Sequence, residues 1–188
     1  MTDFQLHNVE SAPEASKASL EASQKAYGVV PNLHAAMAES PALLEAYKTI
    51  GGIFGKTELS MTEQQIVAMT NNRLNGCTYC MAAHTTIMQG AKVPEDVITS
   101  LREGTQIADP KLEALRQFAE KVNLKRGHLD DGDIEALIDA GYTKQTVLEV
   151  ILGTAFKVLS NYTNHVVQTP LDDMFAKNEW AGESQPAS

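Results

Sequence analysis

Residues 60–90, SMTEQQIVAMTNNRLNGCTYCMAAHTTIMQG, decide the fold. Ser60 and Glu63 have the spacing of a capping box, which marks the start of a helix. Asn75-Gly76 ends that helix, because glycine adopts the left-handed backbone that closes a helix at little cost. A second helix runs from about Cys77 to Gly90, since no residue between them breaks a helix. The stretch therefore predicts two helices joined by a tight turn.

The rest of the chain is also predicted to be helical. Apolar residues recur at the spacing of a helix, and Gly, Pro and Asp mark the ends of the segments. β-branched alternation, which would indicate strands, is missing. The fold class predicted is therefore all-α. Further helices are expected at about 13–27, 32–39, from Pro41 to Gly55, from Pro94, through 112–122 up to Gly127, through 134–138 up to Gly141, and at 143–167.

The segment 143–167 is apolar around most of its girth, so we expect a helix that is buried on several sides. It either lies centrally in its own domain or is also covered by a neighbouring subunit. The segment from Asn178, NEWAGESQPAS, consists mainly of polar and small residues. We therefore predict a single domain over residues 1–177 and a disordered tail over 178–188.

Composition and charge exclude several classes of protein. The formal net charge of −9 repels phosphate groups, and no basic stripe offsets it, so nucleic acid and anionic membranes are not expected as partners. No apolar run approaches the roughly 20 residues of a membrane span. Residues 1–10 lack the pattern of a secretory signal, so we expect a cytoplasmic protein.

The two cysteines of the chain, Cys77 and Cys80, form a C-x-x-C motif, and His84 follows four residues after the second. On a helix these three residues share one face. The positive end of the helix dipole favours a thiolate, so cysteines in the first turn are expected to have a lowered pKa. A histidine one turn further on is placed to act as a general base.

Simple packing, metal binding and a thioredoxin-like site fit the cysteine pair less well. Two buried cysteines can pack as small apolar side chains. A structural zinc site needs four ligands, and an iron–sulfur cluster needs four thiolates, whereas the remaining histidines are scattered at 7, 34, 128 and 165. A thioredoxin-like site would need a preceding strand. We therefore predict thiol redox chemistry with no cofactor and no metal.

The segment N-G-C-T-Y-C-M-A-A-H, residues 75–84, resembles the core signature of the alkyl hydroperoxidase D (AhpD) branch of the carboxymuconolactone decarboxylase superfamily. Residues 28–33 and 39–44 resemble the N-terminal part of family members, and residues 161–165 and 169–172 resemble the C-terminal segment of a subgroup. The resemblance covers about residues 25–175. It implies an AhpD-like helical fold with the active site in a helical hairpin.

The resemblance also implies a function, that of a thiol-dependent peroxidase. In the family the second cysteine attacks the hydroperoxide and the first resolves the product to a disulfide, so Cys80 and Cys77 would take these roles. The partners implied are a small-molecule hydroperoxide and a dithiol reductant that the sequence does not identify. Family members form dimers, trimers or hexamers, which predicts a homo-oligomer.

One position departs from the family pattern. The proton relay commonly includes a glutamate twelve residues before the first cysteine, and this chain has Gln65 there. The hairpin geometry brings Gln65 close to His84, so we expect it to orient the imidazole without titrating. Glu63 is interpreted as an exposed capping residue rather than a substitute. Two interpretations of His165 stay open, a further base in the relay or a core or subunit-contact residue bonded to Asn161.

Two alternative functions remain. True γ-carboxymuconolactone decarboxylases are lyases that act on a lactone acid without a redox cysteine pair, and the C-x-x-C argues against this activity. A non-catalytic redox sensor would use the disulfide to change its shape or its partner. Tyr79, which lies between the cysteines where some relatives have histidine, is interpreted as a packing residue.

Overall fold

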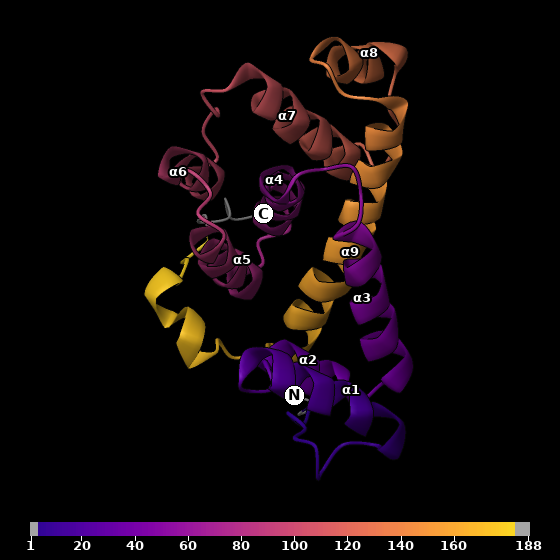
Figure 1. Cartoon of the computed structure of the whole chain (residues 1–188), viewed down its shortest axis with the longest axis vertical. Coiled ribbons are helices and arrows are strands. Elements are labelled where there is room, and N and C mark those ends of the chain that lie inside the picture. The colour runs from indigo at the N-terminus through magenta and orange to yellow at the C-terminus, as the bar shows by residue number, and fades with distance from the viewer. Residues whose placement is uncertain (1–3, 183–188) are drawn as a thin grey trace, which may run out of the picture.

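The computed structural model describes residues 4–182 and is helical throughout, with no strand in that range (Figure 1). The predicted all-α fold class is confirmed. The elements, in chain order, are α1 (Glu14–Tyr27), α2 (Asn32–Met37), α3 (Pro41–Phe54), α4 (Met61–Leu74), α5 (Thr78–Gly90), α6 (Glu95–Glu103), α7 (Pro110–Leu124), α8 (Asp131–Asp139), α9 (Lys144–Val167) and a 3₁₀ helix, η1 (Asp173–Asn178).

The helical hairpin of α4 and α5 forms as the sequence predicts. The Ser60 side chain accepts a hydrogen bond from the Glu63 N–H, and the Glu63 carboxylate accepts one from the Ser60 N–H, which completes the capping box. Gly76 adopts a φ of +66°, a backbone conformation that residues with a side chain rarely adopt. The turn therefore depends on this glycine, and it directs α5 back along α4.

Helix α4 lies at the centre of the molecule, where it packs against α5, α7 and α9. Most residues of α4 are buried, among them Ile66, Val67 and Met69. The long helix α9 runs past α3 and α4 (Figure 1). Gly153 allows this close approach, because a Cβ atom there would come within 2.7 Å of both Phe54 and Val67.

A second core joins the N-terminal helices to the first turn of α5. Its members include Leu33 and Met37 from α2, both cysteines, and Phe175 from η1. In Figure 1, α1 and α2 lie across one end of α9, and η1 lies beside α5. The cysteine pair is therefore enclosed by segments from both ends of the chain.

The C-terminal segment is fixed by specific hydrogen bonds. The Arg102 guanidinium donates to the carbonyl oxygens of Asn178 and Glu179 at 3.0 Å each. The Trp180 indole N–H donates to the Arg102 carbonyl at 3.2 Å, and its ring packs against the main core. The predicted disordered tail therefore begins too early, because Trp180 anchors residues 178–182 in a defined position. Residues 183–188, the rest of the predicted tail, lie outside the described range.

Helix α9 is buried on one side and exposed on the other. It packs against α2, α3, α4, α5, α7 and α8, yet Leu148, Ile151, Tyr162 and Val166 are exposed. The helix is therefore central within the domain and also has an uncovered apolar face. Whether a second subunit covers that face stays a prediction. Among the residues described, no helix is long and apolar enough to span a membrane.

Candidate active site

The cysteine pair lies at the start of α5. Cys77 is the N-cap residue, and its sulfur accepts a hydrogen bond from the Cys80 N–H at 3.4 Å. Both thiols are free and buried, and the exposed fraction of Cys80 is 2%. Cys80 thus lies within the first helical turn, where the positive end of the helix dipole stabilises a negative charge.

Asn164, from α9, contacts both sulfur atoms. Its Nδ2 donates to Cys80 Sγ at 3.2 Å and lies 3.6 Å from Cys77 Sγ. The Oδ1 of the same side chain is buried and has no hydrogen-bond partner in the described structure. The amide is therefore oriented with its donor toward the sulfurs, an arrangement that favours the thiolate form of Cys80.

Lys157, also from α9, is a buried lysine of the site. Its exposed fraction is 1%, and no Asp or Glu of residues 4–182 forms an ion pair with it. Its Nζ lies 2.8 Å from His84 Nε2. A buried ammonium without a carboxylate is costly unless another negative group balances it. Burial lowers the pKa of Lys157, and the negative charge of the cysteine pair, chiefly that of Cys80, acts in the opposite direction and favours the ammonium.

His84 is held at both ring nitrogens. Its Nδ1 lies 2.8 Å from Gln65 Oε1, and its Nε2 faces Lys157. A protonated lysine can only donate, so Nε2 accepts and Nδ1 carries the proton that is donated to Gln65. Burial and the charge of Lys157 keep the pKa of His84 well below 6.5, so the imidazole is neutral at pH 7.

The two cysteines have opposite electrostatic environments. Burial raises the pKa of Cys80, but a hydrogen bond from the Cys77 thiol and the positive charge of Lys157 outweigh it and lower the pKa to about 6. The pKa of Cys77 is raised, because its thiol donates to Cys80 and is buried. The helix dipole predicts a lowered pKa for both cysteines, but in the structure only the pKa of Cys80 is lowered, because the pair shares one negative charge.

A network of asparagine side chains fixes the hairpin against α9. Asn161 Nδ2 donates to Asn72 Oδ1 at 3.0 Å, and Asn75 Nδ2 donates to Asn161 Oδ1 at 2.8 Å. Asn72 Nδ2 in turn donates to the Cys80 carbonyl at 3.3 Å. These amides hold the register of α9 relative to the first turn of α5, so that Lys157 and Asn164 face the cysteines.

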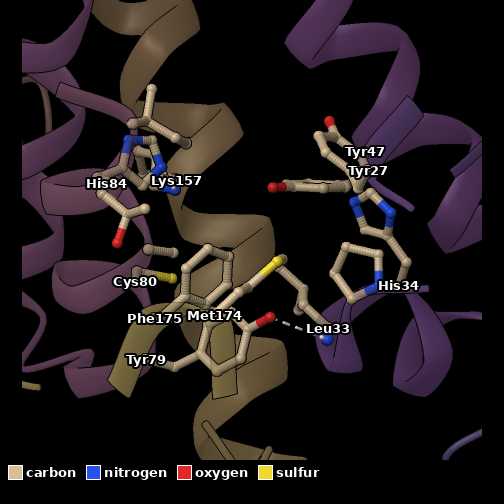
Figure 2. A pocket seen from close by; sticks show the side chains of 14 residues that line it. Tyr27, Leu33, His34, Tyr47, Tyr79, Cys80, His84, Lys157, Met174 and Phe175 are labelled. Carbon is tan, nitrogen blue, oxygen red and sulfur yellow. Dashed lines mark hydrogen bonds between the residues drawn. The ribbon is translucent and has the colours of Figure 1, made fainter. Parts of the chain in front are cut away.

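A cavity of about 280 Å³ opens onto this site (Figure 2). Cys80, His84 and Lys157 line it, whereas Cys77 does not. Figure 2 shows these three residues on one side of the cavity, with Tyr79 and Phe175 below. The Tyr79 hydroxyl donates to Asp172 at 2.5 Å and accepts from the Leu33 N–H at 3.3 Å. Tyr79 therefore packs as predicted and also ties the C-terminal segment to α2.

Four of the five predicted site residues come together, and one does not. Cys77 bonds Cys80, Gln65 contacts His84 as predicted, and Cys80 and His84 line the same cavity. His165 is exposed on α9, and the structure does not bring it to the cysteines. The predicted bond between His165 and Asn161 is also absent from the described structure, because the Asn161 amide bonds Asn72 and Asn75.

Sequence reasoning missed Lys157 and Asn164. A signal for Lys157 existed, because it is the single charged residue within the stretch from Val150 to Leu159. A charged residue among buried apolar neighbours is usually paired or functional. Asn164 carried no such signal, since asparagine is common near the ends of helices. The described residues contain no group of three or more His, Cys, Asp or Glu that could hold a metal ion.

Comparison with known proteins gives the following similarities. Residues 41–121 match the model of the carboxymuconolactone decarboxylase family. The fold is similar to an uncharacterized peroxidase-related protein from Ralstonia eutropha JMP134, described as an alkylhydroperoxidase AhpD core, with a TM-score of 0.79, 23% identity, and coverage of 93% of this chain and 96% of that one. The fold is also similar to a peroxidase-related protein from Silicibacter sp. TM1040. The TM-score is 0.74 at 20% identity, and the match covers 93% of this chain and 95% of that one.

A third similar structure is the debrominase Bmp8 in its C82A form, bound to 2,3,4-tribromopyrrole. Its TM-score is 0.78 at 16% identity, and the match covers 95% of this chain and 96% of that one. No curated protein sequence matches the chain. At these identities the likeness concerns the fold, which is AhpD-like as the sequence predicts.

Proposed function

We propose that the chain, whose residues 41–121 match the carboxymuconolactone decarboxylase family model, is a thiol-dependent oxidoreductase that reduces an organic hydroperoxide. One observation carries the proposal. Cys80, whose pKa is lowered to about 6, lines a cavity large enough for an organic molecule and lies beside a buried cation. A low pKa, a favourable charge and access to a pocket are the properties of a reactive cysteine.

The first step is the attack of the Cys80 thiolate on the distal oxygen of the hydroperoxide, ROOH. The S–O bond forms as the O–O bond breaks, so Cys80 becomes a sulfenic acid and RO⁻ leaves. The sulfur is oxidised by two electrons and the peroxide is reduced by two. The leaving alkoxide takes up a proton to become ROH, and the Lys157 ammonium is the charged donor that lines the cavity.

In the second step, Cys77 resolves the sulfenic acid. The Cys77 sulfur attacks Cys80 Sγ, the S–S bond forms, and the sulfenic oxygen leaves as water after accepting the Cys77 proton. Cys77 lies behind Cys80 rather than on the cavity, which suits resolution better than attack. An external dithiol then reduces the disulfide by thiol–disulfide exchange and restores both thiols.

A second candidate function is reductive dehalogenation of an aromatic ring. It is favoured by the fold of the debrominase and by the aromatic lining of the cavity, which includes Tyr27, Tyr47 and Phe175. The same dithiol would supply two electrons: Ar–Br and two thiols give Ar–H, bromide, a proton and a disulfide. Cys80 would again be the nucleophile.

The decisive experiment compares the substrates directly. The reduced protein is incubated with cumene hydroperoxide, hydrogen peroxide or 2,3,4-tribromopyrrole, with dithiothreitol as reductant, and peroxide loss or bromide release is measured. We expect turnover of cumene hydroperoxide that Cys80→Ser abolishes. Bromide release without peroxide loss would replace the first candidate with the second. Full activity after alkylation of both cysteines would exclude both candidate functions and leave the lyase activity as the alternative.

A further inference from the structure

The cavity has a second polar wall, opposite the cysteine. Figure 2 shows Tyr27, His34 and Tyr47 facing Cys80, His84 and Lys157 across the pocket. Tyr27 and His34 belong to the N-terminal segment, which lies outside the family match at residues 41–121. The wall with Cys80, His84 and Lys157 therefore comes from residues 41–121 and α9. The facing wall comes mainly from the N-terminal segment of this chain.

The hydrogen bonds of His34 determine what it offers to the cavity. Its Nδ1 lies 2.9 Å from Ser23 Oγ, which already donates its single proton to the Ser19 carbonyl and accepts from Lys48 Nζ. Ser23 Oγ must therefore accept from His34, so Nδ1 carries the proton. Nε2 is left as an acceptor, and none of residues 4–182 hydrogen-bonds it.

The imidazole stays in this form at neutral pH. Burial and the nearby Lys48 lower the pKa of His34 to about 4. The ring is fixed by edge contacts with Tyr27 and Tyr47, whose centroids lie 6.0 and 5.7 Å away. Neither tyrosine hydroxyl has a hydrogen-bond partner within the described chain, so the wall offers one acceptor and two hydroxyl donors.

The body of the cavity suits a ring. Six aromatic rings line it, those of Tyr27, His34, Tyr47, Tyr79, His84 and Phe175. Aromatic side chains bind flat apolar molecules through stacked and edge contacts. The volume of about 280 Å³ greatly exceeds the roughly 30 Å³ share of a water-sized molecule, so hydrogen peroxide alone would leave it almost empty.

We propose that the cavity binds a single-ring aromatic substrate whose hydroxyl group, remote from Cys80, donates a hydrogen bond to His34 Nε2 and accepts one from Tyr27 or Tyr47. A phenolic hydroxyl both donates and accepts, which matches the two kinds of polar atom on this wall. That this ligand is a substrate rests on the proposed function of Cys80. The proposal of a binding site itself rests only on the wall formed by Tyr27, His34 and Tyr47.

Binding of an unreactive phenol tests the proposal without catalysis. The reduced protein at pH 7 is titrated with p-cresol and with 4-methylanisole, which has the same ring but no donor, and NMR chemical shifts give the two dissociation constants. We expect p-cresol to bind about tenfold more tightly, the effect of one hydrogen bond to a neutral acceptor. Equal affinities would overturn the proposal.

Variants test whether His34 and the two tyrosines cause the difference in affinity between p-cresol and 4-methylanisole. His34→Phe keeps a ring but removes the acceptor, and should bring the affinity ratio close to one. His128→Gln, at an exposed histidine outside the cavity, should leave the ratio unchanged. If His34→Phe does not fold, as judged by its circular dichroism, a Tyr27→Phe, Tyr47→Phe double variant replaces it and should weaken p-cresol several-fold. An unchanged ratio in the folded variant would overturn the proposal.

The location of the ligand needs its own measurement. Saturating p-cresol should slow the alkylation of Cys80 by iodoacetamide at least several-fold, because the ring occupies the route to the sulfur. Binding without protection of Cys80 would place the phenol elsewhere and overturn the proposal. Binding and protection without any turnover of cumene hydroperoxide or tribromopyrrole would keep the site and refute the proposed function instead.

Discussion

Lys157 Nζ lies 2.8 Å from His84 Nε2 in the interior of the protein. Burial lowers the pKa of the imidazole and keeps it neutral, and the contact adds to this, because a cation beside one ring nitrogen opposes protonation of the ring. It also leaves the positive charge of Lys157 to act on the nearby thiolate, since no carboxylate of the described chain pairs with it. The ionisation of Cys80 should therefore depend on Lys157 more than on His84.

The first prediction concerns Lys157→Met, which removes the charge and keeps a side chain of similar length. Without the cation the protonated thiol is favoured, so the pKa of Cys80 should rise from about 6 by about one unit or more. Alkylation of Cys80 at pH 5 should slow about tenfold. The measurement is the rate of iodoacetamide labelling against pH, with each cysteine followed by peptide mapping.

The matched control is Lys144→Met, at the exposed first residue of the same helix. Its profile should coincide with that of the wild type. A His165→Gln variant should also leave the profile unchanged, because that side chain is exposed. If Lys157→Met labels Cys80 with the wild-type midpoint, the charge of Lys157 has no effect on the thiolate.

The second prediction concerns Gln65→Glu, which places a carboxylate against His84 Nδ1. A negative charge favours the imidazolium, so the pKa of His84, which is held well below 6.5, should rise. Gln65→Leu removes the acceptor without adding charge and should produce no such rise. Histidine NMR titrations measure the effect, with the exposed His128 and His165 as internal controls. A His84 titration that is the same in all three proteins would contradict the role of position 65.

The parts of the site that the sequence predicted are those encoded by short-range spacing. A helical hairpin with its turn at Gly76 fixes which residues of its two arms lie level, so the contact between Gln65 and His84 followed from counting residues along the arms. Likewise, the separation of three residues between Cys77 and Cys80 determined that their side chains share a face.

The contribution of α9 could not be predicted in the same way. Asn164 and His165 are neighbours in sequence, but one residue along a helix is a rotation of about 100°, so only one of them faces the cysteines. The rotation of α9 is set by its packing against segments that are distant in the sequence. Gly153 packs against Phe54, and Asn161 bonds Asn72. The sequence leaves the role of His165 open and assigns none to Asn164, whereas the packing turns Asn164 toward the cysteines.

The third prediction tests this packing through a pair of glycines. Gly153→Ala would place a Cβ atom within 2.7 Å of Phe54 and Val67, so we expect a loss of about 1–3 kcal/mol in the free energy of unfolding. Gly52→Ala, on α3, meets no atom within 4 Å and should stabilise the protein by up to about 1 kcal/mol through helix propensity. Urea denaturation at pH 7 measures both. Stabilisation of similar size in both variants would show that α9 can shift without cost.

The last prediction separates the roles of the two cysteines. Cys77→Ser should reduce one equivalent of cumene hydroperoxide and then stop at a Cys80 sulfenic acid, because serine cannot form a disulfide. Serine is the suitable replacement, since its hydroxyl can still donate a hydrogen bond to the Cys80 sulfur as the Cys77 thiol does. A dimedone adduct located by mass spectrometry identifies the oxidised residue.

Cys80→Ser should consume no peroxide. Cys77 has a raised pKa and does not line the cavity, so it is neither ionised at neutral pH nor in contact with the substrate. Cys77→Ala provides a further comparison, because it removes the donor as well. It should still form the sulfenic acid, but more slowly than Cys77→Ser at pH 6, since the pKa of Cys80 rises when the hydrogen bond is lost. A dimedone adduct on Cys77 in Cys80→Ser, with none on Cys80 in Cys77→Ser, would exchange the two roles.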